Sequence, residues 1–129
     1  MKYDNLFQNN NKIMIIGDVM IDTYLTGKVE RISPEAPVPV VDIDNKTNKL
    51  GGAANVALNI KELGSTPIIC SVIGNDERSK DLELLLWNNE MLTRYIYRTD
   101  RRKTTNKIQI LSGKFSKDEH HRYSRGVLR

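Results

Sequence analysis

Continuous apolar runs alternate along the chain with segments of helical periodicity. The runs over residues 12–17 and 66–74 are typical of parallel strands that are covered on both faces. A helix is predicted between them over 53–63, and Gly64 is its expected stop. The apolar positions of this helix are Ala53, Val56, Ala57, Ile60 and Leu63.

A second helix is predicted over 75–90. Acidic residues suited to a helix N-terminus open this segment, and Leu82, Leu85 and Leu86 follow on one helical face. Half-exposed strands are expected over 93–99 and 104–112. The order strand, helix, strand, helix, strand predicts an α/β domain with a parallel sheet.

The connection between the first predicted strand and the first predicted helix is too long for a simple strand-helix alternation. About 35 residues separate the first strand from the first helix, where roughly 2–6 are typical. This insertion has strand patterns over 22–32 and 37–44, and prolines in the second indicate an edge or projecting strand. Together with 104–112 and the region near 120–125, these segments predict a small sheet at the carboxyl ends of the parallel strands, where it would act as a lid.

Composition limits the class of protein. With 129 residues, of which 39% are hydrophobic, the chain is one domain or part of one. Cys70 lies in an apolar run, where a buried structural thiol is expected, and a single thiol predicts a reducing cytoplasm. No apolar run reaches the length of a membrane span and the N-terminus lacks a signal-peptide core, so we expect a cytoplasmic protein without membrane contact.

Charge is distributed unevenly. Residues 1–93 contain 9 Lys and Arg against 13 Asp and Glu, whereas residues 94–129 contain 11 against 3. The basic end would suit nucleic acid, a phosphorylated ligand or an acidic surface, and a solvated basic face explains it as well. His120 and His121 would point to opposite faces of a strand, so no metal site is predicted there.

Two glycines, Gly51 and Gly52, stand directly before the first predicted helix. Neither a dinucleotide fingerprint nor a Walker loop is present. One hypothesis is that a ligand approaches the backbone at the helix N-terminus, where free N–H groups favour an anion or a hydroxyl and Asn55 could donate and accept. The other is a tight turn, with Asn55 assisting the cap.

The strings GDVMIDTY, RISPEAPVPVV and GGAANVALNI, in this order and spacing, resemble the PfkB/ribokinase family of carbohydrate kinases. More narrowly, they are similar to the kinase domain of bacterial D-glycero-β-D-manno-heptose-7-phosphate kinases, which in many bacteria is fused to an adenylyltransferase in ADP-heptose synthesis. The resemblance implies the N-terminal part of a Rossmann-like three-layer ribokinase fold with a small projecting β-sheet lid. It assigns residues 1–11 to a polar lead-in, 12–129 to the kinase domain, and 23–44 and 104–125 to the lid.

The resemblance also implies a sugar site. Asp22 is the first candidate for binding sugar hydroxyls, since a carboxylate can accept from two of them. Gly51, Gly52 and Asn55 would hold further hydroxyls, and Asp18 is a second candidate that could equally cap a turn. Cations for a substrate phosphate, each of which could instead be simply exposed, are Arg31, Lys103, Lys107 and Arg122.

ATP and Mg²⁺ are the implied cofactors, and a homodimer through the lid strands is the implied assembly. The family's Gly-Ala-Gly-Asp motif, which holds the transferred phosphate and supplies the catalytic base, has no match in these 129 residues. We therefore expect no catalytic residue here, no kinase activity of this chain alone, and an apolar surface left uncovered by only two helices. The alternative is a non-catalytic dimerising or sugar-binding module, and a nucleic-acid binder is third because no recognised motif supports it.

Overall fold

The computed structural model describes residues 11–113 and 123–128. The chain divides into two compact units. Within the described residues, the first unit comprises 11–21 and 49–106, and the second comprises 22–48, 107–113 and 123–128.

The first unit is a parallel three-stranded sheet with two helices. Its strands are β1 (Lys12–Ile16), β4 (Thr66–Gly74) and β5 (Ile96–Thr99), in the order β1-β4-β5. In the register, Ile15 pairs with Ile69 and Val72 pairs with Tyr97. The helices are α1 (Ala53–Glu62) and α2 (Glu77–Asn88). The α/β class expected from the sequence is confirmed.

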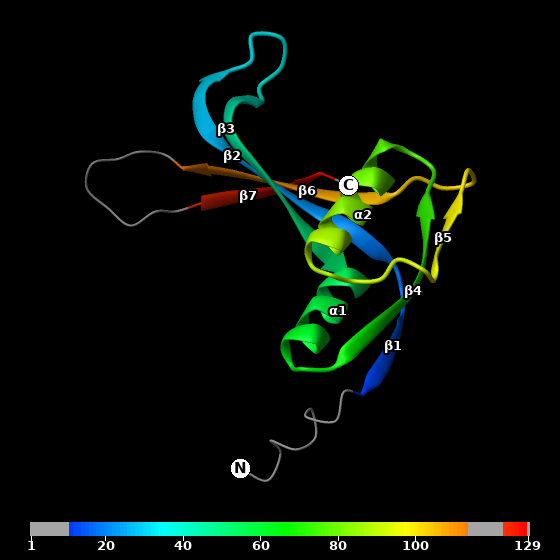
Figure 1. Cartoon of the computed structure of the whole chain (residues 1–129). Helices are drawn as coiled ribbons and strands as arrows, with labels where there is room; N and C mark the ends of the chain where they lie inside the picture. Colours follow the sequence, from blue (N-terminus) through cyan, green and yellow to red (C-terminus); the bar gives the residue numbers. More distant parts are fainter. Residues whose placement is uncertain (1–10, 114–122, 129) are drawn as a thin grey trace, which may run out of the picture. The chain divides into compact units, whose positions relative to one another are not determined.

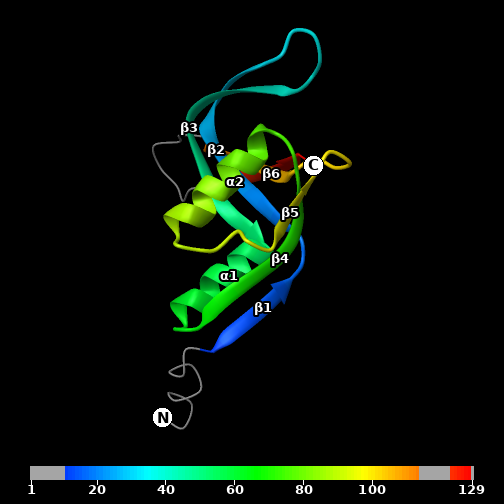
Figure 2. The ribbon, with the colours of Figure 1, turned by 45° about the vertical axis from the view of Figure 1, so that its right-hand side comes forward.

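Both helices lie on the same face of this sheet (Figures 1 and 2). The strand order proceeds in one direction from β1 to β5, and right-handed crossovers then place each connecting helix on the same side. Ile69 and Ile73 of β4 point to this side and are 1% exposed, and Leu82 and Leu86 of α2 are fully buried against it. The core of the unit is therefore a single layer between one sheet face and two helices.

The two helices cover one face of the strands 12–17 and 66–74, and Met14 and Ile16 are exposed on the other face. The apolar surface that two helices were expected to leave uncovered is therefore present. Two expectations about the burial of single side chains are wrong. Cys70 is only partly buried, although a buried thiol is expected from the sequence. In α1, Val56 and Leu63 are exposed rather than part of the core. The helix buries its small residues Ala53, Ala54 and Ala57, because its N-terminal turn lies close to Gly17 and Asp18 at the end of β1.

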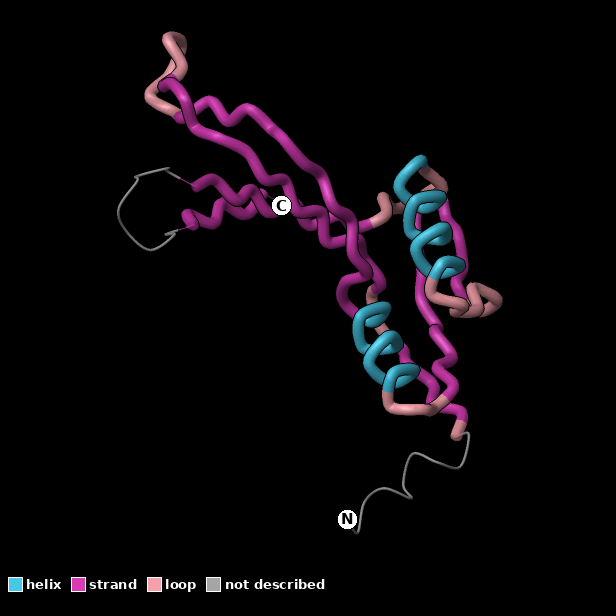
Figure 3. The backbone as a smooth tube through the Cα atoms, turned by 60° about the vertical axis from the view of Figure 1, so that its left-hand side comes forward, coloured by secondary structure: helices cyan, strands magenta, loops and turns pink. Residues whose placement is uncertain are grey.

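The second unit contains most of a four-stranded sheet in the order β3-β2-β6-β7. Its strands are β2 (Val19–Ile32), β3 (Pro39–Gly52), β6 (Thr105–Gly113) and β7 (Tyr123–Leu128), and β6 and β7 are antiparallel. Figure 3 shows the two long strands joined by a loop, and the shorter pair beside them. The edge-strand prediction for 37–44 is confirmed, because β3 is at one end of the sheet order.

The long strands approach each other closely at Gly27. A Cβ atom added there would overlap the backbone carbonyl of Asp42. A glycine inside a strand commonly marks such a close backbone approach. His120, His121 and Arg122 lie outside the described residues.

Candidate functional site

The corner between β1 and β2 determines where α1 begins. The backbone carbonyl of Asp18 accepts a hydrogen bond of 2.9 Å from the N–H of Ala53, the first residue of α1. Gly17, just before Asp18, lies close to the helix start, since an added Cβ would lie 3.3 Å from the Ala53 Cβ, slightly inside ordinary contact distance. The end of β1 and the start of α1 are thus in direct contact.

Gly52 is the N-cap of α1 and has φ +57° and ψ −134°. This backbone conformation is essentially restricted to glycine. A Cβ added to Gly52 would overlap the Asp18 carbonyl oxygen and lie 3.0 Å from Met20 Cε. The bare backbone at Gly52 therefore has a structural cause inside the chain, namely the contact with the β1–β2 corner.

The N-terminus of α1 also lacks a side chain that caps its first N–H groups. Gly52 has no side chain to cap the helix, and the first turn contains no acidic residue. The first N–H groups of a helix carry a partial positive charge and favour an anion or a hydroxyl oxygen. Asn55, in this first turn, is exposed, so its amide is accessible beside those N–H groups. Gly51 is buried at the end of β3.

Arg102 is a residue of this corner that was not predicted from the sequence. Its Nη1 donates to Asp18 Oδ1 at 3.0 Å and its Nη2 donates to Thr105 Oγ1 at 3.2 Å. Arg102 and Asp18 are 84 residues apart in the chain. No local spacing rule connects them, so no signal in the sequence could have indicated this pair.

Asp22, the first candidate from the sequence, lies on β2 and begins the second unit. Its Oδ1 atom is buried and has no hydrogen-bond partner among the described residues. Buried polar atoms are nearly always paired in folded proteins, and an orphaned one calls for an explanation such as a ligand. Asp22 thus keeps acceptor capacity that the described part of the chain does not use.

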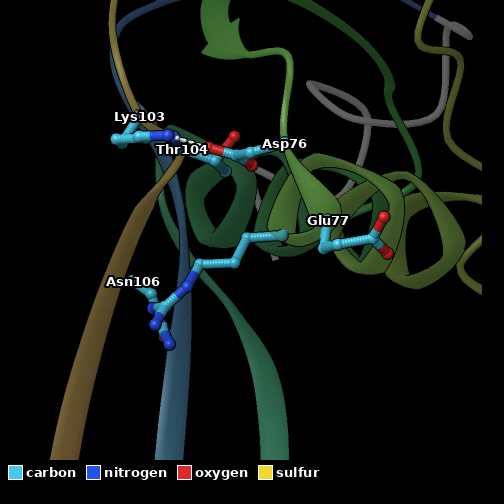
Figure 4. A pocket seen from close by; sticks show the side chains of 6 residues that line it. Asp76, Glu77, Lys103, Thr104 and Asn106 are labelled. Atoms are coloured by element: carbon cyan, nitrogen blue, oxygen red, sulfur yellow. Dashed lines mark hydrogen bonds between the residues drawn. The ribbon is translucent and has the colours of Figure 1, made fainter.

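A separate hollow of about 480 Å³ lies at the N-terminus of α2 (Figure 4). Asp76 is the N-cap of α2: its Oδ1 accepts from the Ser79 N–H at 3.0 Å and its Oδ2 from the Thr104 N–H at 2.8 Å. The Thr104 hydrogen bond is the main cause of a lowered pKa at Asp76, which Ser79 and the positive charge of Lys103 lower further, against a smaller opposing effect of burial. This carboxylate is occupied in holding the loop before β6 against α2.

Gly74 makes this junction possible. An added Cβ would lie 2.6 Å from Asp76 Oδ2 and 2.7 Å from both Arg102 O and Thr104 N. The acidic start of this helix is predicted from the sequence, whereas the loop that Asp76 binds is not. Asp is a favoured N-cap residue, so its contact with the nearby Ser79 N–H is a local signal, but its Thr104 partner is 28 residues away.

The basic candidates are dispersed. Lys103 lines the hollow at α2, while Arg31 on β2 and Lys107 on β6 belong to the second unit, and all three are exposed. Arg122 is outside the described residues. Within residues 11–113 and 123–128, the structure has no group of three or more His, Cys, Asp or Glu that could hold a metal ion. No helix in that part of the chain is long and apolar enough to cross a membrane.

The chain has a parallel sheet, a long strand insertion between β1 and α1, and two glycines directly before the N-terminus of α1. This combination is that of a ribokinase-type α/β protein. Solved structures have this fold. The Arabidopsis thaliana ribokinase complexed with ribose and ATP aligns with a TM-score of 0.65 over 92% of this chain and 36% of that chain, at 14% identity. A Methanocaldococcus jannaschii nucleoside kinase, an archaeal member of the ribokinase family, aligns with a TM-score of 0.59 over the same shares, at 22% identity.

The family model of the pfkB family carbohydrate kinases matches residues 10–119. The chain belongs to this family. The bifunctional protein HldE of Coxiella burnetii (strain RSA 331 / Henzerling II) is 37% identical over 134 residues, which cover 98% of this chain and 28% of that protein. The bifunctional protein HldE of Helicobacter hepaticus is 44% identical over 100 residues, covering 78% of this chain and 21% of that protein. The chain thus spans about a quarter of the length of these relatives.

Proposed function

We propose that this chain is the sugar-binding portion of an ATP-dependent kinase that phosphorylates D-glycero-β-D-manno-heptose 7-phosphate at C1, in the synthesis of ADP-heptose for lipopolysaccharide. The observation that carries the proposal is the buried, unpartnered Oδ1 of Asp22. Family membership and the relatives named HldE support the sugar class.

The chemistry of Asp22 suits a polyol. A carboxylate accepts hydrogen bonds only, and sugar hydroxyls are strong donors that can fill its open lone pairs. Since Oδ1 is shielded from water, binding a hydroxyl there would remove an unsatisfied buried acceptor, and that adds to the affinity.

The start of α1 would hold further hydroxyls. Its first N–H groups donate, while the exposed amide of Asn55 both donates and accepts. Gly52 is exposed at the helix start, whereas Gly51 is buried at the end of β3, so Gly52 is the glycine at which a hydroxyl would meet the backbone. Asp18 itself is engaged with Arg102, so in this proposal it orients the corner rather than binding the sugar alone.

The substrate phosphate requires positive charge. Arg31, Lys103 and Lys107 are exposed and can reach a phosphate without first breaking an ion pair within the described residues. Arg122 is a fourth candidate by sequence. Arginine would bind phosphate through two parallel hydrogen bonds and lysine as a point charge.

Phosphoryl transfer itself is assigned to polypeptide other than these 129 residues. ATP supplies the transferred phosphoryl group and Mg²⁺ neutralises its charge. The described residues form neither a glycine-rich phosphate loop nor a carboxylate cluster for a metal, so they do not fit ATP or Mg²⁺. In this proposal the chain alone does not turn over ATP, acts in the cytoplasm, contacts neither nucleic acid nor membrane, and dimerises through its lid strands.

Calorimetric titration of the chain with heptose 7-phosphate tests the proposal. Wild type should bind, and Asp22→Asn should weaken binding by about tenfold or more, because a hydrogen bond to a charged group is worth roughly 1.5–3 kcal/mol. Asp42→Asn is the matched control, since Asp42 is an exposed carboxylate on the neighbouring strand β3. Equal affinity of Asp22→Asn and wild type would reject the assignment.

A further inference from the structure

Gln109 on β6 is a buried polar residue that has no role in the contacts described so far. It is 8% exposed. Thr23, Ser79 and Thr104 are also buried, and each of them has a side-chain hydrogen bond. The amide of Gln109 forms none with the residues that the structure describes. An amide has two donor hydrogens and an acceptor oxygen, so burying it without partners costs free energy that a bound ligand would recover.

The neighbouring strand carries a second group of this kind. Strands β2 and β6 are adjacent in the sheet order β3-β2-β6-β7, and β2 contains Asp22, whose buried Oδ1 has no partner within the described part of the chain. Asp22 and Gln109 both belong to the second unit. Because buried polar groups are nearly always paired, two exceptions on adjacent strands point to one shared ligand.

The two groups complement each other chemically. The carboxylate of Asp22 only accepts hydrogen bonds, so it suits the O–H hydrogen of a hydroxyl. The amide of Gln109 donates to a hydroxyl oxygen through its N–H groups and accepts from another hydroxyl through its carbonyl. A polyol offers donors and acceptors on adjacent carbon atoms. A bare anion offers acceptors only and would leave Asp22 unpaired.

The face of β6 that contains Gln109 also contains Lys107. Side chains two positions apart on a strand point to the same side. Lys107 is exposed and Gln109 is buried. This face therefore offers a cation at an accessible position and a neutral amide at a shielded one, which suits a sugar that bears a phosphate at one end.

We propose that Gln109 is a further sugar-binding residue, which binds hydroxyl groups of the substrate through its side-chain amide. This inference rests on the proposed function, because it takes the sugar as the ligand of Asp22. It adds a neutral group that reads the hydroxyls to the cations that are candidates for the phosphate.

Gln109→Met tests the inference, since it removes the amide and keeps an unbranched side chain of similar length. The urea midpoint of this variant should equal or exceed that of wild type, because replacing an unpaired buried polar group by an apolar one is neutral or stabilising. In calorimetric titration, its affinity for heptose 7-phosphate should fall about three- to tenfold, as expected for the loss of one neutral hydrogen bond. A purely structural role of Gln109 would produce the opposite pair of results.

Ile110→Met is the matched control. Ile110 is half-buried on the same strand, and its side chain points to the opposite face of the sheet. This volume-conserving change should leave the affinity for heptose 7-phosphate as it is in wild type. In the ¹⁵N-labelled chain, the side-chain amide signals of Gln109 are assigned by their loss in Gln109→Met. They should shift saturably with heptose 7-phosphate and stay in place with inorganic phosphate.

Four results would overturn the inference. A lowered urea midpoint of Gln109→Met would show that the amide is paired inside the chain. Unchanged affinity of Gln109→Met, together with weakened binding by Asp22→Asn, would remove Gln109 from the site and leave the proposed function standing. An equal loss of affinity in Ile110→Met would assign the effect to the packing of β6. A wild-type chain that does not bind heptose 7-phosphate would remove the proposed function and this inference with it.

Discussion

Replacing Gly52 by alanine should strongly destabilise the first unit. Gly52 has φ +57° and ψ −134°, a conformation that costs a non-glycine residue roughly 1–3 kcal/mol. The added Cβ would also overlap the Asp18 carbonyl oxygen, which belongs to the backbone and cannot rotate away. Overpacking of this kind costs typically about 1–3 kcal/mol. The two effects together predict a loss of roughly 2–6 kcal/mol out of the ~5–15 kcal/mol that stabilises a domain.

Urea titration followed by far-UV circular dichroism measures this loss of free energy of unfolding. The protein concentration is chosen in the range where the wild-type midpoint does not change with it. With a slope of about 1–3 kcal/mol per M, the midpoint should fall by at least roughly 1 M. Gly17→Ala is the control, because its Cβ would meet only the Ala53 methyl at 3.3 Å and should cost less than about 1 kcal/mol. A Gly52→Ala variant within about 0.5 kcal/mol of wild type would show that neither the φ of Gly52 nor its contact with Asp18 constrains the chain, since surface changes without a structural role stay in that range.

Three further predictions concern the α2 junction and the reaction. The lowered pKa of Asp76 means that its charged form stabilises the fold above its unfolded pKa near 3.8, and that this stability is lost as pH falls through the folded pKa. Asp76→Asn should therefore lower the free energy of unfolding by about 1 kcal/mol at pH 7 and make its fall in acid less steep, as measured by urea melts at several pH values. The same fall in acid for the variant and wild type would contradict this role of Asp76. Gly74→Ala should cost roughly 1–3 kcal/mol in the same melts, because its Cβ would lie 2.7 Å from two backbone atoms; a midpoint equal to that of Gly17→Ala would show that the loop can move away. A coupled assay of the chain with heptose 7-phosphate, ATP and Mg²⁺ should stay at background, and turnover that follows the purified protein through chromatography would show that the chain carries transfer groups of its own.

The elements of the first unit could be predicted because their signals are local. Asp76 and the leucines of α2 lie within one helix, and the expected burial of Leu82 and Leu86 is confirmed. The buried side of α1 could not be predicted in the same way. Ala53 and Ala57 belong to the expected stripe with Val56 and Leu63, but also to a narrower stripe with Ala54. The contact of α1 with the β1–β2 corner buries the narrower stripe. The spacing of apolar residues along the helix does not reveal this contact.

Long-range pairs explain the remaining differences. Arg102 binds Asp18 across 84 residues, and the Thr104 N–H binds Asp76 across 28. Gly52 could be recognised as unusual from the sequence, although its cause is the carbonyl of Asp18. A ligand and a tight turn are the alternatives that the sequence leaves open for Gly51 and Gly52. The structure adds a third reason for Gly52, a close approach of the chain to itself, and the sugar at this helix remains a proposal.

Amide chemical shifts of the ¹⁵N-labelled chain during titration with heptose 7-phosphate show which residues the sugar contacts. We expect saturable shifts at Asp22 and over 51–55, with little change at Asp76 and Thr104, because Asp76 and Thr104 belong to the α2 junction. A titration with inorganic phosphate alone should not reproduce the shifts at 51–55, since these groups are assigned to hydroxyls. Shifts confined to the hollow at α2, or none at concentrations of several millimolar, would contradict a sugar site at the start of α1.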